Sequence, residues 1–230
     1  MSSNKNLIQK LKLHQFASVV PFNLHDPNVY VFDFSETNEE LNDLDVSDIQ
    51  KFTDYCFNKL KENKTPVGVG GYAEKRSIYK KSNVFETSGG YRSVHLGVDI
   101  TAVTGTEVFA PLDGKVHSFQ NNSSFGDYGP TIILEHNLDD EIFYTLYGHL
   151  SLNSLEGLFE GKEIDKGEKI AELGDPEVNV GWPPHLHFQL ITDMLGKKGD
   201  FPGVCLPSEK GYYLSHCPDP NLILKIEKLM

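Results

Sequence analysis

PPHLHFQL, residues 183–190, is the stretch that decides the fold. Alternate positions in it are polar, namely His185, His187 and Gln189. The positions between them are apolar, namely Leu186, Phe188 and Leu190. Because side chains alternate along a strand, this pattern predicts a strand with one apolar and one polar face. The two imidazoles would lie roughly 7 Å apart, so one can bind a metal ion while the other reaches a water or a substrate.

The segments around this stretch are short β-rich runs separated by Gly, Pro, Asn and Asp. The runs are TEVFAPLDG, TIILEH, IFYTLYGHL, KIAELG and HLHFQLI. They predict a mainly β fold, α+β overall, built on an antiparallel sheet. Two segments share a pattern of glycines around an alternating run, GTEVFAPLDGKV (105–116) and GKEIDKGEKIAELG (161–174). Their similarity indicates a folded-over sheet with similar turns.

The N-terminal third has a different sequence pattern, which predicts helices as well as a strand. We expect a helix over residues 4–17 and a strand at NVYVFDF, residues 28–34. Ser47 and Gln50 form a capping box, and an amphipathic helix follows them and ends before Pro66. The apolar stripe of that helix is Ile49, Phe52, Cys56 and Leu60. It should bury this stripe against the β domain.

The chain of 230 residues is long enough for one large domain with an appendage. We expect three parts: a small N-terminal α/β segment at 1–75, the β domain at 76–200, and a C-terminal extension packed on that domain at 201–230.

The net charge of the chain indicates which classes of binding partner are unfavourable. There are 21 Lys and Arg against 33 Asp and Glu, a net charge of −12, which repels phosphate backbones and anionic headgroups. We therefore expect no nucleic-acid partner. We also expect no membrane insertion, because no run of 18 apolar residues occurs. Three cysteines without a CxxC pair, and an N-terminus without an apolar signal region, predict a cytoplasmic chain.

HLGVD, residues 95–99, is the second stretch that suggests chemistry. His95 and Asp99 would be about 13 Å apart on a straight strand, too far for one ion. Gly97 is therefore expected to bend the chain through φ values that other residues resist, which brings the imidazole and the carboxylate together. The alternative is that Asp99 only caps or turns the chain.

The two stretches together predict a metal site. His95, Asp99 and one histidine of the pair His185 and His187 would give Zn²⁺ two imidazoles and one carboxylate, with an open fourth position. No HExxH sequence occurs, so the base must come from elsewhere. The candidates are His149, in LYGHLS, and whichever histidine of the pair is not a ligand. The remaining histidines, expected to be structural or exposed, are His14, His25, His117, His136 and His216.

At this point the sequence resembles the M23 zinc peptidases, the lysostaphin-like and LytM-like peptidoglycan endopeptidases. The resemblance rests on HxGxD (95–99), GTEVFAPLDGKV, YGHLS and HxH (185–187), and covers residues 90–195. It implies that Zn²⁺ is held by His95, Asp99 and His187. It implies that His149 and His185 lie beside the reacting water and the scissile carbonyl.

The resemblance also implies a fold and a reaction. The fold is a mostly antiparallel sheet with the site in a groove, and residues 76–200 would be the zinc peptidase domain. The usual reaction is endopeptidase cleavage of cell-wall cross-links, often next to glycine or D-alanine. The expected partner is a peptide substrate, with peptidoglycan fragments among the candidates; no oligomeric state is predicted.

A narrower similarity concerns the M23-type domain that bacteria fuse to class III aminotransferases and kinase-like phosphotransferases. The segments that carry it are YGPTIILEH, FYTLYGHLS, GWPPHLHFQL, GDFPGV and CPDPNLIL. We expect no export signal at this N-terminus, so either the substrate is an intracellular peptide or amide, or export uses information outside this chain.

Two other functions use the same residues. Two histidines and one carboxylate also bind Fe(II) in facial-triad oxygenases, although the spacing HxD of that motif differs from the spacing here. M23-like domains that have lost ligands act as non-catalytic binding or regulatory modules. The presence of all five residues favours the enzyme.

Overall fold

The computed structural model describes residues 2–81 and 83–230. Its main element is an eight-stranded sheet in the order β1-β2-β6-β13-β10-β9-β8-β11. The strands are β1 Tyr30–Phe32, β2 Gly68–Gly70, β6 Val98–Thr101, β8 Gly114–Asn122, β9 Gly129–Leu138, β10 Glu141–Gly148, β11 Glu163–Ile164 and β13 His185–Ile191. Strands β1 and β2 are parallel, and the other neighbouring pairs are antiparallel. The predicted mainly β fold, α+β overall, is confirmed.

Two-stranded sheets flank the main sheet in the described part of the chain. They pair β3 Glu86–Thr87 with β4 Gly90–Tyr91, β5 Val94–His95 with β14 Val204–Cys205, and β7 Glu107–Phe109 with β12 Lys169–Glu172. The two segments with the shared glycine pattern pair with each other twice, through β7 with β12 and through β8 with β11. The folded-over arrangement that their similarity indicated is therefore present.

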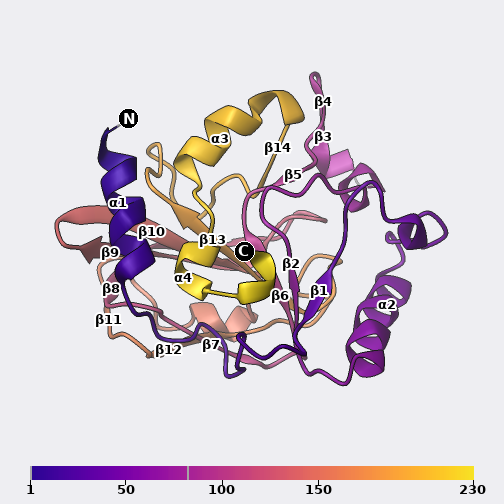
Figure 1. Cartoon of the computed structure of the whole chain (residues 1–230), viewed down its shortest axis with the longest axis horizontal. Coiled ribbons are helices and arrows are strands. Elements are labelled where there is room, and N and C mark those ends of the chain that lie inside the picture. The colour runs from indigo at the N-terminus through magenta and orange to yellow at the C-terminus, as the bar shows by residue number, and fades with distance from the viewer. Residues whose placement is uncertain (1, 82) are drawn as a thin grey trace.

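The helices lie around the sheet (Figure 1). They are α1 Ser2–Leu13, α2 Ile49–Glu62, α3 Lys210–His216 and α4 Asn221–Leu224. Short 3₁₀ turns occupy Glu39–Leu41, Ile78–Lys81, Asn83–Phe85, Leu152–Leu155, Pro207–Glu209 and Glu227–Leu229. Figure 1 shows α1 beside α4 and, at the opposite side of the view, α2 beyond β1. None of the described helices is long and apolar enough to cross a membrane.

Two predicted helix ends need correction. The first helix ends at Leu13 rather than at residue 17. The second begins one residue later than the capping box implied, because Asp48 and not Ser47 is the N-cap. The Asp48 carboxylate accepts the backbone N–H groups of Gln50 and Lys51, so it satisfies two donors of the first turn. As expected, this helix buries most of its apolar stripe, namely Phe52, Cys56 and Leu60, whereas Ile49 is half-buried.

The main sheet separates the apolar core into layers. One face packs against α1 and α4 through a cluster that includes Leu7, Leu11, Leu186, Phe188, Leu190 and Ile223. The other face carries two clusters. One joins α2 to β1 through Phe32, Phe34, Phe52 and Leu60, and the other includes Tyr128, Leu146, Ile191 and Phe201. The polar face of β13 lies between these two clusters, so the fold leaves a site there.

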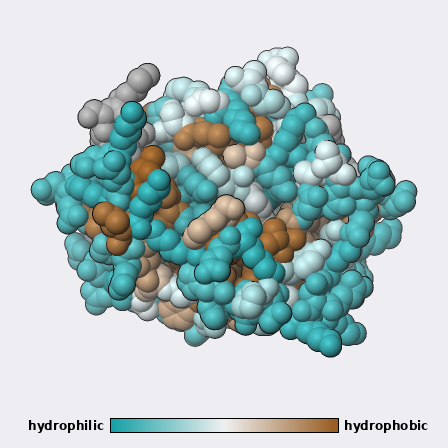
Figure 2. Space-filling model, in the orientation of Figure 1, coloured by the Kyte–Doolittle hydropathy of each residue, from teal (hydrophilic) through white to brown (hydrophobic). Residues whose placement is uncertain are grey.

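The first 75 residues contribute directly to the main sheet, because β1 and β2 extend it beyond β6. The segment is therefore docked, as the apolar stripe of α2 required. The boundaries at 75 and 200 stay predictions. In the view of Figure 2 the described surface is mostly hydrophilic, and its apolar side chains form small separate patches.

Candidate metal and active site

Strand register brings the site residues into one row across the sheet. The row consists of Phe32, Gly70, Asp99, His187 and Gly148, one from each of five neighbouring strands. The two glycines leave room for side chains that pack over them. A Cβ atom on Gly70 would lie 2.8 Å from Nη2 of Arg76, and one on Gly148 would lie 2.7 Å from Cδ1 of Tyr128. The row thus fixes Asp99 and His187 side by side.

A bend at Gly97 brings the His95 side chain next to Asp99 and His187. The chain bends at Gly97, and the distance from His95 Nε2 to Asp99 Oδ1 is 3.2 Å. The expected reason for the glycine was wrong, because its φ is not in the left-handed region. Space is the actual reason: a Cβ atom there would lie 2.6 Å from both Cε1 and Nε2 of His187.

We expect Gly97→Ala to weaken metal binding by at least about 10-fold, comparable to losing an outer-shell contact, because the new methyl group must push the His187 ring away. Zinc affinity can be measured by competition with a chromogenic chelator. Gly211→Ala is the matched control, since no atom lies within 4 Å of a Cβ placed there. Wild-type affinity in Gly97→Ala would contradict the steric explanation.

His95, Asp99 and His187 form a tight triangle of potential ligand atoms. His95 Nε2 lies 3.0 Å from His187 Nδ1, and each of these nitrogens lies 3.2 Å from Asp99 Oδ1. In a tetrahedral zinc site with metal–ligand distances of about 2.0–2.2 Å, neighbouring ligand atoms are about 3.3–3.6 Å apart. Among the described residues, these three are the group of His, Cys, Asp or Glu side chains close enough to hold a metal ion.

Hydrogen bonds at the outer side of each imidazole determine its tautomer. His95 Nδ1 lies 3.0 Å from the carbonyl oxygen of Gly71, so it must carry the hydrogen and donate. His187 Nε2 lies 2.9 Å from Gln189 Oε1. The Gln189 amide nitrogen donates to the carbonyl of Pro202, so Oε1 is an acceptor and His187 Nε2–H donates to it.

These tautomers leave lone pairs on both inner nitrogens. His95 Nε2, His187 Nδ1 and Asp99 Oδ1 therefore converge with no hydrogen between them. Three converging lone pairs repel one another unless a cation lies among them, so the residues present fit a metal ion.

Electrostatics keep this group in its metal-binding protonation state. Burial, with the Arg76 guanidinium nearby, lowers the pKa of the His95 imidazole to about 4. Burial alone would raise the pKa of the Asp99 carboxyl, but His95 and Arg76 hold that pKa well below its usual range. At neutral pH the set is therefore one carboxylate with a neutral His95.

His149 and His185 lie together beside the triangle. Their ring centroids are 4.1 Å apart, and His185 Nε2 lies 3.8 Å from Asp99 Oδ1. His185 Nδ1–H donates to the Pro183 carbonyl at 2.7 Å, which leaves the lone pair on Nε2. Burial lowers the pKa of His185, and burial with the neighbouring imidazoles holds the pKa of His149 well below its ordinary value. Both rings are therefore neutral at neutral pH, and that of His185 has a lone pair on Nε2.

The backbone at His149 is unusual. Its φ of 63° lies in the left-handed region, directly after the end of β10. Two hydrogen bonds hold it there, from its N–H to the Tyr128 carbonyl and from Gly174 N–H to its own carbonyl. Residues in such conformations cluster at functional sites.

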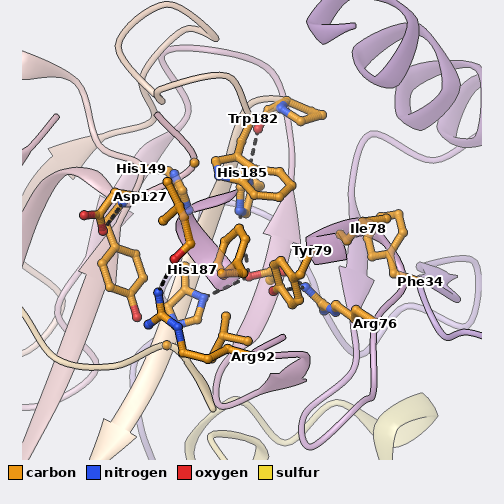
Figure 3. Close-up of a pocket in the computed structure, with 18 of the residues that line it drawn as sticks. Phe34, Arg76, Ile78, Tyr79, Arg92, Asp127, His149, Trp182, His185 and His187 are labelled. Carbon is orange, nitrogen blue, oxygen red and sulfur yellow. Dashed lines mark hydrogen bonds and ion pairs between the residues drawn. The ribbon is translucent and has the colours of Figure 1, made fainter. Parts of the chain in front are cut away.

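A cavity of ≈ 240 Å³ adjoins these side chains. Asp99, His149, His185 and His187 line it, while His95 lies buried behind them. Figure 3 shows the three lining histidines at the centre, with Asp127 on one side and Arg76 with Tyr79 on the other. Aromatic side chains form much of the remaining wall, namely Phe34, Phe52, Tyr79, Phe85 and Trp182.

Comparison with known proteins identifies a matching family. Residues 93–198 match the family model described as peptidase family M23. This match covers a little under half of the chain. This finding confirms the family resemblance, whereas the narrower similarity to domains fused to aminotransferases stays a prediction.

Two curated relatives match part of the chain. An uncharacterized metalloprotease of Haemophilus influenzae is 35% identical over 95 residues, which are 41% of this chain and 18% of the relative. The peptidoglycan DD-endopeptidase ShyA of Vibrio cholerae is 30% identical over 98 residues, 43% of this chain and 20% of the relative. The chain thus spans about a fifth of the length of these relatives.

A solved structure is also similar. The catalytic domain of lysostaphin from Staphylococcus simulans is 26% identical, with a TM-score of 0.41, and the match covers 58% of this chain and 80% of that one.

The structure brings together all five residues that the sequence singled out, and adds three that it missed. Arg76 and Gly71, which contact Asp99 and His95, lie outside the matched range of the M23 domain. No local pattern around them indicates a site. Gln189, which bonds His187, shares the polar face of β13, so its alternation with the apolar residues was a usable signal.

Proposed function

We propose that this chain is a zinc-dependent peptidase that hydrolyses a peptide or amide bond. The observation that carries the proposal is the convergence of three lone pairs from His95, Asp99 and His187 beside a cavity. Two histidines and one carboxylate are a common ligand set of catalytic zinc, which leaves a fourth position open. The M23 match over residues 93–198 supports the same activity.

His95, Asp99 and His187 would hold the ion. A bound zinc ion would lower the pKa of water and polarise a carbonyl oxygen. His185 and His149 would do the proton transfers: each presents a neutral imidazole to the cavity, so one can accept a proton from the reacting water and the protonated ring can stabilise negative charge on the carbonyl oxygen.

The proposed substrates are peptides, including fragments of peptidoglycan. The relative ShyA is named a peptidoglycan DD-endopeptidase, which supports testing D-amino-acid peptides. The cavity of ≈ 240 Å³, with Phe34, Phe52 and Trp182 in its wall, favours short substrates over bulky polymers.

The alternatives predict different results. An Fe(II) oxygenase would use the same triangle with iron, and a binding module would hold a peptide without cleaving it.

We expect the purified chain to contain one zinc ion and to hydrolyse short peptides. Elemental analysis measures the metal, and mass spectrometry of peptides with glycine or D-alanine at the scissile bond measures cleavage. Chelation should stop hydrolysis because it removes the ion, and added Zn²⁺ should restore it. Iron as the bound metal, or hydrolysis that survives complete removal of metal, would overturn the proposal.

A further inference from the structure

The Asp99 carboxylate is held from behind by a buried arginine. Arg76 Nη1 donates to Asp99 Oδ2, the oxygen that faces away from His95 and His187. The Arg76 side chain is only 1% exposed. An arginine is seldom buried without a partner, because an unpaired buried charge is costly. The ion pair with Asp99 therefore helps to keep Arg76 buried beside the site.

Arg76 is fixed on its other edges as well. Its Nε donates to Glu74 Oε2 at 2.7 Å, and Nη1 also lies 3.2 Å from the Tyr79 hydroxyl. Nη2 donates to the Gly71 carbonyl at 3.3 Å. The planar guanidinium lies over the Phe34 ring, 5.3 Å from its centroid.

Glu74 connects this arginine to the N-terminal segment. Its second carboxylate oxygen, Oε1, accepts the backbone N–H of Phe34, two residues after β1. A continuous chain of hydrogen bonds therefore runs from Phe34 through Glu74 and Arg76 to Asp99. Gly71 in the same segment accepts from His95. The outer contacts of two of the three ligand residues thus come from residues 71–76.

The ion pair with Arg76 limits the number of carboxylate oxygens that Asp99 can present to a metal ion. With Oδ2 bonded to Arg76, only Oδ1 faces the two imidazole nitrogens, so the carboxylate can supply one oxygen and not two. A second carboxylate oxygen would occupy the position that catalysis needs open. Glu74 neutralises the Arg76 charge, so the arginine restrains the carboxylate without adding net positive charge beside a cation.

We infer that Arg76, with Glu74 as its counter-ion, is a positioning residue that holds Asp99 as a one-oxygen ligand. Residues 71–76 would then complete a metal site whose three ligand residues lie within the range matched by the M23 family, residues 93–198. The inference rests on the proposed function, because it requires a metal ion at the triangle.

The test uses a variant that preserves the net charge, Glu74→Gln with Arg76→Gln. We expect zinc affinity to fall by about 10- to 100-fold, the usual cost of losing an outer-shell partner. At saturating Co²⁺ the visible absorption of the cobalt-substituted protein should weaken, because a two-oxygen Asp99 raises the coordination number. Arg76→Lys keeps a charge that can reach Asp99 and should recover part of both signals.

An ion pair between Lys75 of this segment and Glu36 supplies the control. Lys75, which is exposed, and Glu36, which is half-buried, form an ion pair with 2.6 Å between Nζ and Oε2. Lys75→Gln with Glu36→Gln should keep wild-type affinity and spectrum. Gly70→Ala adds an uncharged test, since its Cβ atom would lie 2.8 Å from Arg76 Nη2 and displace it.

The outcomes separate the two proposals. A wild-type chain that binds no metal would sink the proposed function. A wild-type chain that binds zinc, with folded Arg76 and Gly70 variants that keep its affinity and cobalt spectrum, would overturn the positioning role alone. If the double variant does not fold, Arg76→Lys and Gly70→Ala decide between these results.

Discussion

Replacing Asp99 by asparagine is expected to abolish zinc binding in a chain that still folds. Asp99 provides the one negative charge among the three converging atoms, and its Oδ1 lies 3.2 Å from both inner nitrogens. The loss of a direct ligand should exceed the roughly 10- to 100-fold cost of an outer-shell change. Elemental analysis should therefore find about one zinc ion per chain in the wild type and a background level in Asp99→Asn.

His187→Ala should behave like Asp99→Asn, because it removes another corner of the triangle. Asp127→Asn is the matched control, since Asp127 lines the same cavity but belongs to no ligand set in the described structure. Full zinc occupancy in both Asp99→Asn and His187→Ala would refute the ligand assignment.

The second large effect is expected from the two remaining histidines of the cavity. His149→Ala and His185→Ala should retain zinc but each lose hydrolysis by about 10²-fold or more, the usual contribution of a proton-transfer group or an oxyanion donor. The physical reason is their place beside the triangle, with ring centroids 4.1 Å apart, instead of at one of its corners. Initial rates at saturating zinc measure the effect.

His25→Ala, at an exposed position, should leave both zinc content and rate unchanged. The two histidines of β13 provide the critical comparison. Loss of metal in His185→Ala together with retention in His187→Ala would show that their roles are exchanged.

The sequence was most informative where chemistry and periodicity coincide. In HLHFQLI the alternation predicted both the strand and its polar face, and the register confirms that His187 lies opposite Asp99. The alternation left open which histidine of the pair His185 and His187 lies nearer to His95. The structure places His187 Nδ1 at 3.0 Å from His95 Nε2 and His185 beyond it. The roles of these residues stay predictions.

Other parts of the site could not be predicted, because tertiary contacts create them. Strand β2, Gly68–Gly70, contains two glycines and has little intrinsic preference for a strand; it forms because it pairs with β6. Arg76 is separated from Asp99 by 23 residues and belongs to no motif. At α2, Ser47 and Asp48 are both good caps, and sequence alone does not choose between them.

The separation of the ligands along the chain has a consequence for folding. His95 and His187 are 92 residues apart, and the strands β8, β9 and β10 lie between them along the chain. Contacts of such high sequence separation form late, since the entropy of closing the loop is lost before the contact is gained. The unfolded chain therefore offers an ion no preformed triangle, and an ion that binds only the native state stabilises that state by mass action. Availability of the metal would then influence how much of the chain remains folded, and with it how much survives degradation in a cell.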